Sequence, residues 1–439
     1  MSDGPYRRVW RLAWPMILSN LTVPLLGAVN TAVMGHLPDP AYLGAVALGA
    51  MVFNFLYWGF GFLRMSTTGF TAQALGAREP DEVRATLGRA LGLGLGLGLC
   101  LVALQVPIAL VTFGLLDAAA DVEELAAVYL HIRIWSAPAA LANYAMLGWF
   151  LGMQSPRLAL IHQVFVNGLN IVLDLVFVIG LGWDVAGVAA ATAIAEASGV
   201  VLALALVARR LRYVAGAWSW PRIADPARVA AMLRVNRDIF IRTLCLVLSF
   251  ALFVAEGARL GTAVLAANAV LQNFLTFMAY GLDGFAHASE ALVGRAQGAG
   301  DRAAFRAAVR AATVCAAAVA GVYFLVFAAV GGLLIRLLTD IPDIRELAFT
   351  YLPWAVATPL LGVWSFQLDG IFIGATRGRE MRNAMIASLA VFLVALWTLP
   401  GIWGNHGLWA SLMVMYVARA LTLGVQYPGI ERAVDQPAG

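Results

Sequence analysis

Long apolar segments recur along the whole chain, and they constrain its fold more than any other feature of the sequence. Cutting the sequence at its polar connections gives about twelve of them, each long enough to cross a hydrocarbon core of ~30 Å as a helix. Only 12% of the residues are charged, whereas a soluble domain carries about 25%. The sequence therefore predicts an all-α polytopic membrane protein with twelve transmembrane helices. The predicted spans lie at approximately 13–37, 41–75, 88–115, 125–152, 157–182, 186–208, 236–261, 264–296, 307–338, 344–374, 382–403 and 407–428.

The first predicted span contains two prolines. Pro15 and Pro24 predict a bent or locally unwound helix, because proline lacks a backbone N–H and crowds the preceding turn. The residues before this span show no small-residue cleavage site, and the apolar run continues to full span length. We therefore expect a membrane helix here rather than a cleaved signal peptide.

Arginines mark one side of the predicted spans. The alternate connections are acidic or neutral, with few exceptions. By the positive-inside rule both termini are cytoplasmic, and an even number of spans agrees with this orientation. We expect a multi-pass protein of a bacterial-type cytoplasmic (inner) membrane. The arginine-bearing stretches are 7–11, 78–89, 157, 209–237, 295–310 and 377–382.

The two halves of the chain resemble each other at a constant offset. Gly148 and Gly152 align with Gly370 and Gly374, which lie 222 residues later (370 − 148). Parallel six-helix repeats are a transporter architecture. The matches predict two six-helix lobes related by internal repeat, at 1–212 and 236–439, with a cytoplasmic connection at 213–235. Two further ungapped matches share the offset: Gly76 with Gly298, and Tyr129-Leu130 with Tyr351-Leu352.

The fifth predicted span carries Asn170 and Asp174 in otherwise apolar surroundings. The two residues are four apart, so in a helix they lie on one face, one turn from each other. A carboxylate at the centre of a membrane helix costs roughly 2.5–3.5 kcal/mol, so it must pair, protonate or face a polar cavity. An amide one turn away can donate to the ionised acid or accept from the neutral one. This pair predicts a site for a proton, a sodium ion or a cationic ligand.

Several function classes lack their motifs in this sequence. We see no nucleotide-binding loop, nucleophile triad or metal-ligand cluster, so we expect no enzyme activity, no ATP drive and no cofactor beyond a coupling ion. The chain has no lysine, and its net charge of +4 reflects where the arginines lie rather than nucleic-acid binding. We expect a monomer whose partners are the lipid bilayer and small amphipathic cations.

Five motifs in both halves resemble those of the multidrug and toxic compound extrusion (MATE) transporters, in the DNA-damage-inducible (DinF-like) branch. The resemblance implies two six-helix lobes in a V shape, a central cleft, and efflux of amphipathic cations in exchange for protons or sodium. The motifs are PLLGAVNTAVMGHL (24–37), FLRMSTTGFTAQALGA (62–77), NGLNIVLDLVFVIGLGWDVAGVAAATAIAE (167–196), LDGFAHASEALVGRAQGA (282–299) and LDGIFIGATRGREMRNAM (368–385).

The resemblance also implies which residues bind the coupling ion. The family's amino-lobe cation site matches Asn170, Asp174 and Thr192 here, and these three could also hold sodium. The family motif in the first helix usually reads VDTA, but this chain has Asn30 in place of the aspartate. An asparagine can hydrogen-bond or offer a carbonyl oxygen, but it cannot titrate.

A secondary site or gate could involve four more charged residues. Asp369 lies in the tenth span, where the sodium-coupled branch of the resembled family places a coupling acid, and Asp283 lies in the eighth. Glu256 is either a replacement for the missing aspartate or half of an i,i+3 pair with Arg259. Arg64, in the second span, is either a structural counter-ion or part of a gate.

The sequence favours a secondary active transporter that exports organic cations or drugs by antiport against protons or sodium ions. Two alternatives stay open: a lipid-linked precursor flippase on a related twelve-helix plan, and a coupling-deficient paralogue. A flippase of that kind should carry more arginines within its spans, where Arg64 is nearly alone. The coupling-deficient paralogue rests on Asn30.

Overall fold

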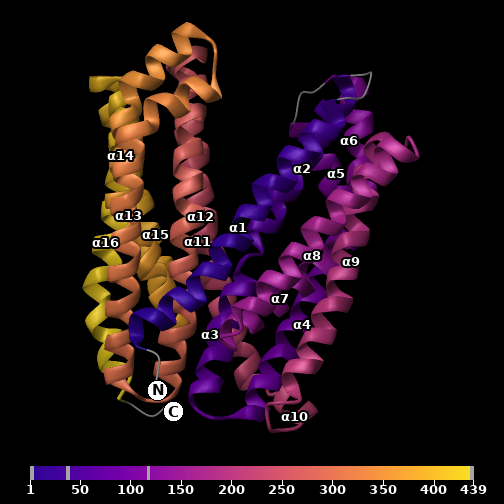
Figure 1. The fold of residues 1–439 in the computed structure, drawn as a ribbon, viewed down its shortest axis with the longest axis vertical. Coiled ribbons are helices and arrows are strands. Elements are labelled where there is room, and N and C mark those ends of the chain that lie inside the picture. The colour runs from indigo at the N-terminus through magenta and orange to yellow at the C-terminus, as the bar shows by residue number, and fades with distance from the viewer. Residues whose placement is uncertain (1–3, 36–39, 116–118, 436–439) are drawn as a thin grey trace. The chain divides into compact units, whose positions relative to one another are not determined.

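The structure of this chain is a computed structural model that describes residues 4–35, 40–115 and 119–435, and every regular element in those ranges is helical. Within them, 12 spans are long and apolar enough to cross a membrane, which confirms the predicted fold class. The chain divides into two compact units (Figure 1). We call Leu18–Ala230 the amino-terminal unit, and Met1–Ile17 with Ala231–Gly439 the carboxy-terminal unit.

The amino-terminal unit contains the second half of α1 (Pro5–Gly35) and the elements up to α10. Three of its predicted spans are interrupted. The second breaks between α2 and α3, the fourth at a 3-10 turn, and the fifth widens into a π-helical turn. The elements are α2 (Pro40–Gly59), α3 (Phe62–Gly76), α4 (Pro80–Ala103), α5 (Gln105–Leu115), α6 (Ala120–Arg133), the 3-10 turn η1 (Ile134–Ser136), α7 (Ala137–Gly152), α8 (Pro156–Asp174), the π turn η2 (Leu175–Gly180), α9 (Asp184–Leu211) and α10 (Trp220–Ile223).

The interruptions have local causes and fall near polar residues. Pro138 lies at the start of α7, where its missing N–H cannot continue the α-helical ladder from α6. The π turn begins directly after Asp174. Single π turns inside helices are frequent at functional sites. Both breaks therefore mark the middle of a span as a region where side chains are specially placed.

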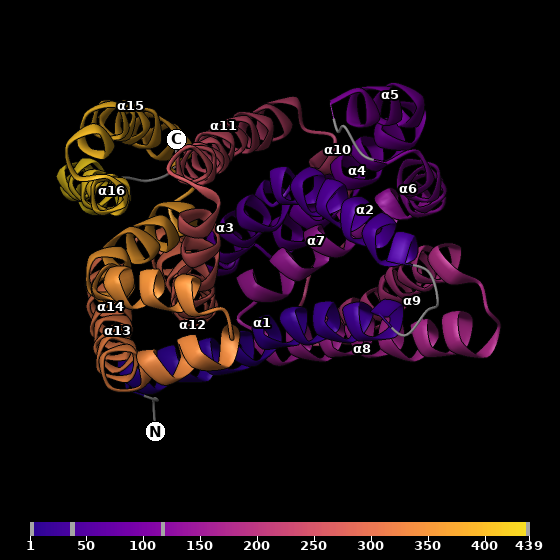
Figure 2. The same ribbon diagram turned by 90° about the horizontal axis from the view of Figure 1, so that it is seen from above.

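The carboxy-terminal unit consists of long helices with few breaks. Figures 1 and 2 both show α13 beside α14 and α15 beside α16, and these pairs are in contact. Its core also takes in the beginning of α1: Val9 and Leu12 are buried against it, and the Trp10 and Phe285 rings meet edge to face at 5.1 Å. The helices are α11 (Pro226–Arg259), α12 (Thr262–Gly298), α13 (Arg302–Leu338), α14 (Pro342–Gly374), α15 (Gly378–Trp403) and α16 (Asn405–Ala433).

Two expectations about helix boundaries need correction. α1 is helical throughout Pro5–Gly35, so neither Pro15 nor Pro24 unwinds it. The seventh span also begins earlier than predicted, because α11 starts at Pro226 and α10 precedes it. Arginines in this stretch obscured the helix in the hydropathy pattern, although a proline at the first helical position is a known start signal.

The internal repeat is visible in the closest helix contacts of each unit. A Cβ at Gly148 would collide with the Arg64 carbonyl, and one at Gly370 would collide with the Ala286 carbonyl. Both partners in these contacts differ by 222 residues (370 − 148 and 286 − 64). Glycine at these positions lets two helices approach closely. The relation repeats one turn on, with Gly152 against the Thr68 carbonyl and Gly374 against the Glu290 carbonyl.

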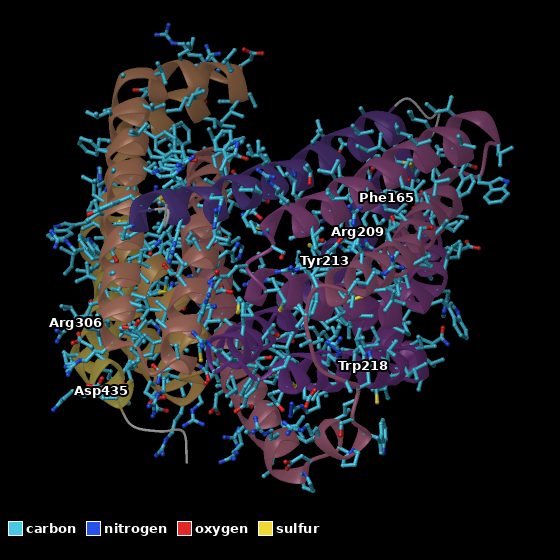
Figure 3. All side chains as sticks on the ribbon, turned by 60° about the horizontal axis from the view of Figure 1, so that its bottom comes forward. Phe165, Arg209, Tyr213, Trp218, Arg306 and Asp435 are labelled. Atoms are coloured by element: carbon cyan, nitrogen blue, oxygen red, sulfur yellow. The ribbon has the colours of Figure 1, made fainter. Side chains whose placement is uncertain are left out.

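One arginine pair follows the same offset at the helix ends. Arg84 of α4 donates to three carbonyls beyond or at the end of α9, including Leu211 at 3.3 Å. Arg306 of α13, which lies 222 residues later (306 − 84), binds Glu431 near the end of α16. Figure 3 shows Arg306 and Asp435 at the same end of the carboxy-terminal unit. In each unit an arginine of the third helix thus fastens the last helix, which supports the duplication.

Candidate functional site

The amino-terminal unit brings together the four residues that the sequence assigned to the cation site. Asn170 and Asp174 lie on α8, Thr192 on α9 and Asn30 on α1. Asn170 Nδ2 donates to Thr192 Oγ1 at 3.0 Å, and that hydroxyl donates to the Val188 carbonyl at 3.0 Å. The threonine therefore bonds its own helix and at the same time ties α9 to α8.

Asn30 contacts Asp174 directly. One atom of its amide faces two acceptors, Asp174 Oδ2 at 2.7 Å and the Leu26 carbonyl at 3.2 Å, so that atom is the nitrogen. A second polar bridge runs parallel to the first, because Asn167 Nδ2 donates to Thr22 Oγ1 at 2.6 Å. The two bridges fix this half of α1 along α8. They place an amide donor where the resembled family has a carboxylate.

The site keeps two acceptor oxygens without a partner. Asp174 and Asn170 are buried, at 0% and 2% exposure. Within the described residues, Asp174 Oδ1 and Asn170 Oδ1 accept no hydrogen bond. An unsatisfied buried polar atom costs about 1–3 kcal/mol. A proton on the carboxyl group, or a cation shared by the two oxygens, would remove that cost, so the geometry suits the binding of a small cation.

Sequence reasoning missed two charged residues next to this site. Arg133, the last residue of α6, is the charged group that acts electrostatically on Asp174, and Glu196 of α9 acts on Arg133. Glu196 follows Thr192 by four residues and hence lies on the same face of α9. That spacing, at the end of the motif 167–196, was the signal that could have revealed it. Arg133 could have been noticed as a charge inside the predicted span 125–152.

The carboxy-terminal unit holds its acid differently. Asp369 of α14 accepts from Arg242 of α11 and from Arg419 of α16, and all three side chains are buried. Asp283 also acts electrostatically on Arg242. The statement that Arg64 is nearly alone within the spans is therefore wrong, because Arg133, Arg242 and Arg419 lie there too.

Two other predicted residues lie apart from the amino-terminal cation site. Glu256 pairs with Arg259 at 2.8 Å near the end of α11, in the carboxy-terminal unit, as the i,i+3 alternative expected. Arg64 lies on α3, where its backbone packs on Gly148 and its charge acts on Tyr144. The structure thus gathers Asn30, Asn170, Asp174 and Thr192, and separates Glu256 and Asp369 from them.

Comparisons with known proteins agree with this arrangement. The MatE family model matches residues 15–176 and 239–398. The chain is 46% identical over 417 residues to DNA damage-inducible protein F of Escherichia coli strain K12, covering 95% of this chain and 91% of that protein. It is 21% identical over 421 residues to multidrug export protein MepA of Staphylococcus aureus strain MSSA476, covering 93% and 90%.

Solved structures show the same fold. A MOP superfamily transporter from Pyrococcus furiosus Vc1 superposes with a TM-score of 0.89 at 19% identity, covering 99% of this chain and 97% of that one. An outward-facing multidrug resistance MATE family transporter also gives a TM-score of 0.89, at 20% identity, covering 98% and 97%. Members of this family are transporters rather than enzymes. The chain belongs to the MatE family and is a twelve-span multidrug efflux transporter of the DinF-like branch.

Proposed function

We propose that this protein exports amphipathic organic cations by antiport against protons or sodium ions, and that Asp174 is its main coupling acid. One observation carries the proposal: a fully buried carboxylate inside a span has one oxygen without a partner and a neutral amide on the other. Such an acid can gain or lose a small cation without breaking a salt bridge. Its relatives in bacteria include a multidrug export protein.

The ion is expected to be the proton more than sodium. Asn30 takes the position of a second carboxylate, so Asp174 is the one anionic ligand among the four site residues. Sodium would be held by that single carboxylate and by neutral oxygens of Asn170 and Thr192. A proton needs only one oxygen. Loss of an anionic ligand therefore weakens sodium binding more than proton binding.

The remaining features of the proposal concern topology and assembly. Duplicated lobes at 1–212 and 236–439, joined at 213–235, would place both termini in the cytoplasm of a bacterial cell with the protein in its inner membrane. The supporting observations are the arginine-rich connections and the repeated contacts at an offset of 222 (370 − 148). We propose a monomer that needs no cofactor beyond the coupling ion.

The experiment uses everted membrane vesicles that contain the protein and take up the fluorescent cation ethidium. A proton gradient and a sodium gradient are imposed separately, at the same size. Ethidium accumulation driven by the proton gradient alone supports proton antiport, and accumulation driven by sodium alone reverses the expected ion preference. Asp121→Asn, which removes an exposed acid of α6, is the matched control and should transport like the parent. No accumulation under either gradient would favour the coupling-deficient paralogue.

A second candidate function gains from the structure. Arg133, Arg242 and Arg419 lie within spans, which is more positive charge than the sequence analysis weighed against a flippase for anionic lipid-linked precursors. The structural relative from Pyrococcus furiosus is itself described as having a binding pocket of reverse polarity that suggests a different function. Arg242 and Arg419, however, already share Asp369. Transfer of an anionic fluorescent lipid across proteoliposomes, with no ethidium transport, would favour this second function.

A further inference from the structure

Arg133 is surrounded by aromatic rings in the middle of the amino-terminal unit. Its guanidinium carbon lies 4.7 Å from the ring centroid of Phe53, 5.6 Å from that of Tyr129 and 5.9 Å from that of Tyr57. Cation–π attraction acts within about 6 Å of a ring centroid. All three rings are buried. We call these three residues the aromatic box.

The arginine inside the box forms no direct ion pair. Its Nη1 donates to the Tyr129 hydroxyl at 2.7 Å, and its Nε has no partner. No carboxylate of the described ranges lies within 4.0 Å of it. Its charged neighbours act at longer range: Glu196 on one side and Asp174 on the other. Arg133 therefore lies between two acids without being committed to either.

Glu196 supplies a carboxylate beside the box. One of its oxygens, Oε2, is buried without a partner, and so is the Tyr57 hydroxyl. Ser136 of η1 is the polar neighbour of both side chains. The backbone is held firmly here, because Asn143 Nδ2 donates to the Glu196 carbonyl at 2.9 Å. Three aromatic rings with a nearby carboxylate are the surroundings that an organic cation prefers, and here they surround the protein's own arginine.

We propose, on the basis of the proposed antiport function, that the aromatic box and Glu196 form the cargo subsite, and that cargo displaces Arg133 toward Asp174. In this scheme Arg133 is a tethered competitor for an organic cation. The break at η1, directly after Arg133, gives its side chain a backbone that is not locked in one long helix. Once displaced, the guanidinium has Asp174 as its remaining acidic neighbour.

The displacement couples cargo to proton. A positive charge that approaches a carboxyl group favours the ionised form, so the proton of Asp174 leaves to water as cargo enters. The charge of the cluster is unchanged, because one cation replaces one proton while Arg133 and Glu196 keep their charges. Exchange of a monovalent cation is then electroneutral and responds to the pH difference but not to the membrane potential. The titratable or charged groups near the cluster are Tyr57, Tyr129, Tyr144 and Glu196, with Arg64 near Tyr144 and His162 on Asn143.

The test measures ethidium binding to the purified full-length protein by fluorescence anisotropy, and proton release by a pH indicator in weakly buffered solution. For the parent we expect about one proton per ethidium. Arg133→Gln should bind ethidium at least as tightly, because the competitor is gone, but should release fewer than about 0.2 protons. Arg133→Lys keeps the charge and should restore release. Glu196→Gln should weaken binding by about tenfold, as expected for loss of the counter-ion.

Three results would overturn the inference. They are proton release by Arg133→Gln equal to that of the parent, weaker ethidium binding by Arg133→Gln with intact folding, or parental binding by Glu196→Gln. Tyr129→Phe, which removes only a hydroxyl group, keeps the test possible should an Arg133 variant fail to fold, and it should leave ethidium binding within about threefold. Arg259→Gln, which removes an exposed arginine of the other unit, is the control. Failure of these variants with gradient-driven ethidium transport intact would leave the antiport function standing.

Discussion

The two units bury their central acids in opposite ways. Asp174 of the amino-terminal unit contacts a neutral amide and keeps one oxygen unpartnered. Asp369 of the carboxy-terminal unit accepts hydrogen bonds from two buried arginines. Both are aspartates inside predicted spans, and the sequence alone suggested a role in coupling for each. The partners, rather than the residue type, separate an acid that can exchange a cation from one that is committed to a structural network.

The comparison also explains which changes should hurt folding and which should hurt transport. Removing one member of a buried ion-pair network leaves the others charged and unpaired. Removing the charge of an acid that has only neutral direct partners leaves hydrogen bonds that an amide can largely replace. Variants at Asp369 are therefore expected to lose stability, and variants at Asp174 to lose function.

The largest effect on stability is expected at the network of Asp369. Asp369→Asn should destabilise the protein by about 3–5 kcal/mol, because Arg242 and Arg419 are left without their shared carboxylate. Thermal unfolding of the purified protein, followed by size-exclusion chromatography, measures the loss. Asp343→Asn removes an exposed acid at the start of α14 and serves as the control. A melting temperature equal to that of the parent would contradict the structural role of the network.

A smaller and symmetric loss is expected from the repeated glycine contacts. Gly148→Ala and Gly370→Ala each place a methyl group against a carbonyl of the neighbouring helix, with an expected cost of about 1–3 kcal/mol. The two variants should lower the melting temperature by similar amounts, since the contacts are repeat mates. Gly96→Ala, with open space around its Cβ, should have little effect. Unequal losses would show that the two units do not share this contact.

The spans, the repeat and the neighbours of Asp174 on α8 and α9 could be predicted from the sequence. Long apolar runs identify spans, and spacings of four residues identify shared helix faces at Asn170 and Asp174. The partners of Asp369 could not be predicted, because Arg242 and Arg419 lie 127 and 50 residues away and no local pattern links them. The aromatic box is similar, since it depends on a helix break that turns Arg133 toward α2.

The next prediction sharpens the amino-terminal half of the comparison. Asn30→Asp puts a second carboxyl group 2.7 Å from the position of Asp174 Oδ2. Because two like charges repel, the pair should share a proton, and proton-driven efflux should extend to higher pH than in the parent. Sodium should also protect the site more strongly in this variant. The measurement is a pH titration of ethidium efflux with and without sodium, and an unchanged profile would disconnect position 30 from Asp174.

The smallest effect is expected at the pair of Glu256 and Arg259. The arginine side chain is 79% exposed, so the pair contributes about a few tenths of a kcal/mol at most. Glu256→Gln should therefore transport and unfold like the parent. A strong loss of transport in this variant would revive Glu256 as the replacement for the acid missing at position 30.

The central claim is that Asp174 couples the gradient to efflux, and Asp174→Asn tests it most directly. Ethidium efflux from everted vesicles is measured between pH 6 and 8 under an imposed proton gradient, with expression and melting temperature compared in parallel. The account predicts a folded, membrane-inserted protein whose gradient-driven efflux is abolished at every pH. Efflux at the parental rate across this range would contradict it and would move the coupling site away from the amino-terminal unit.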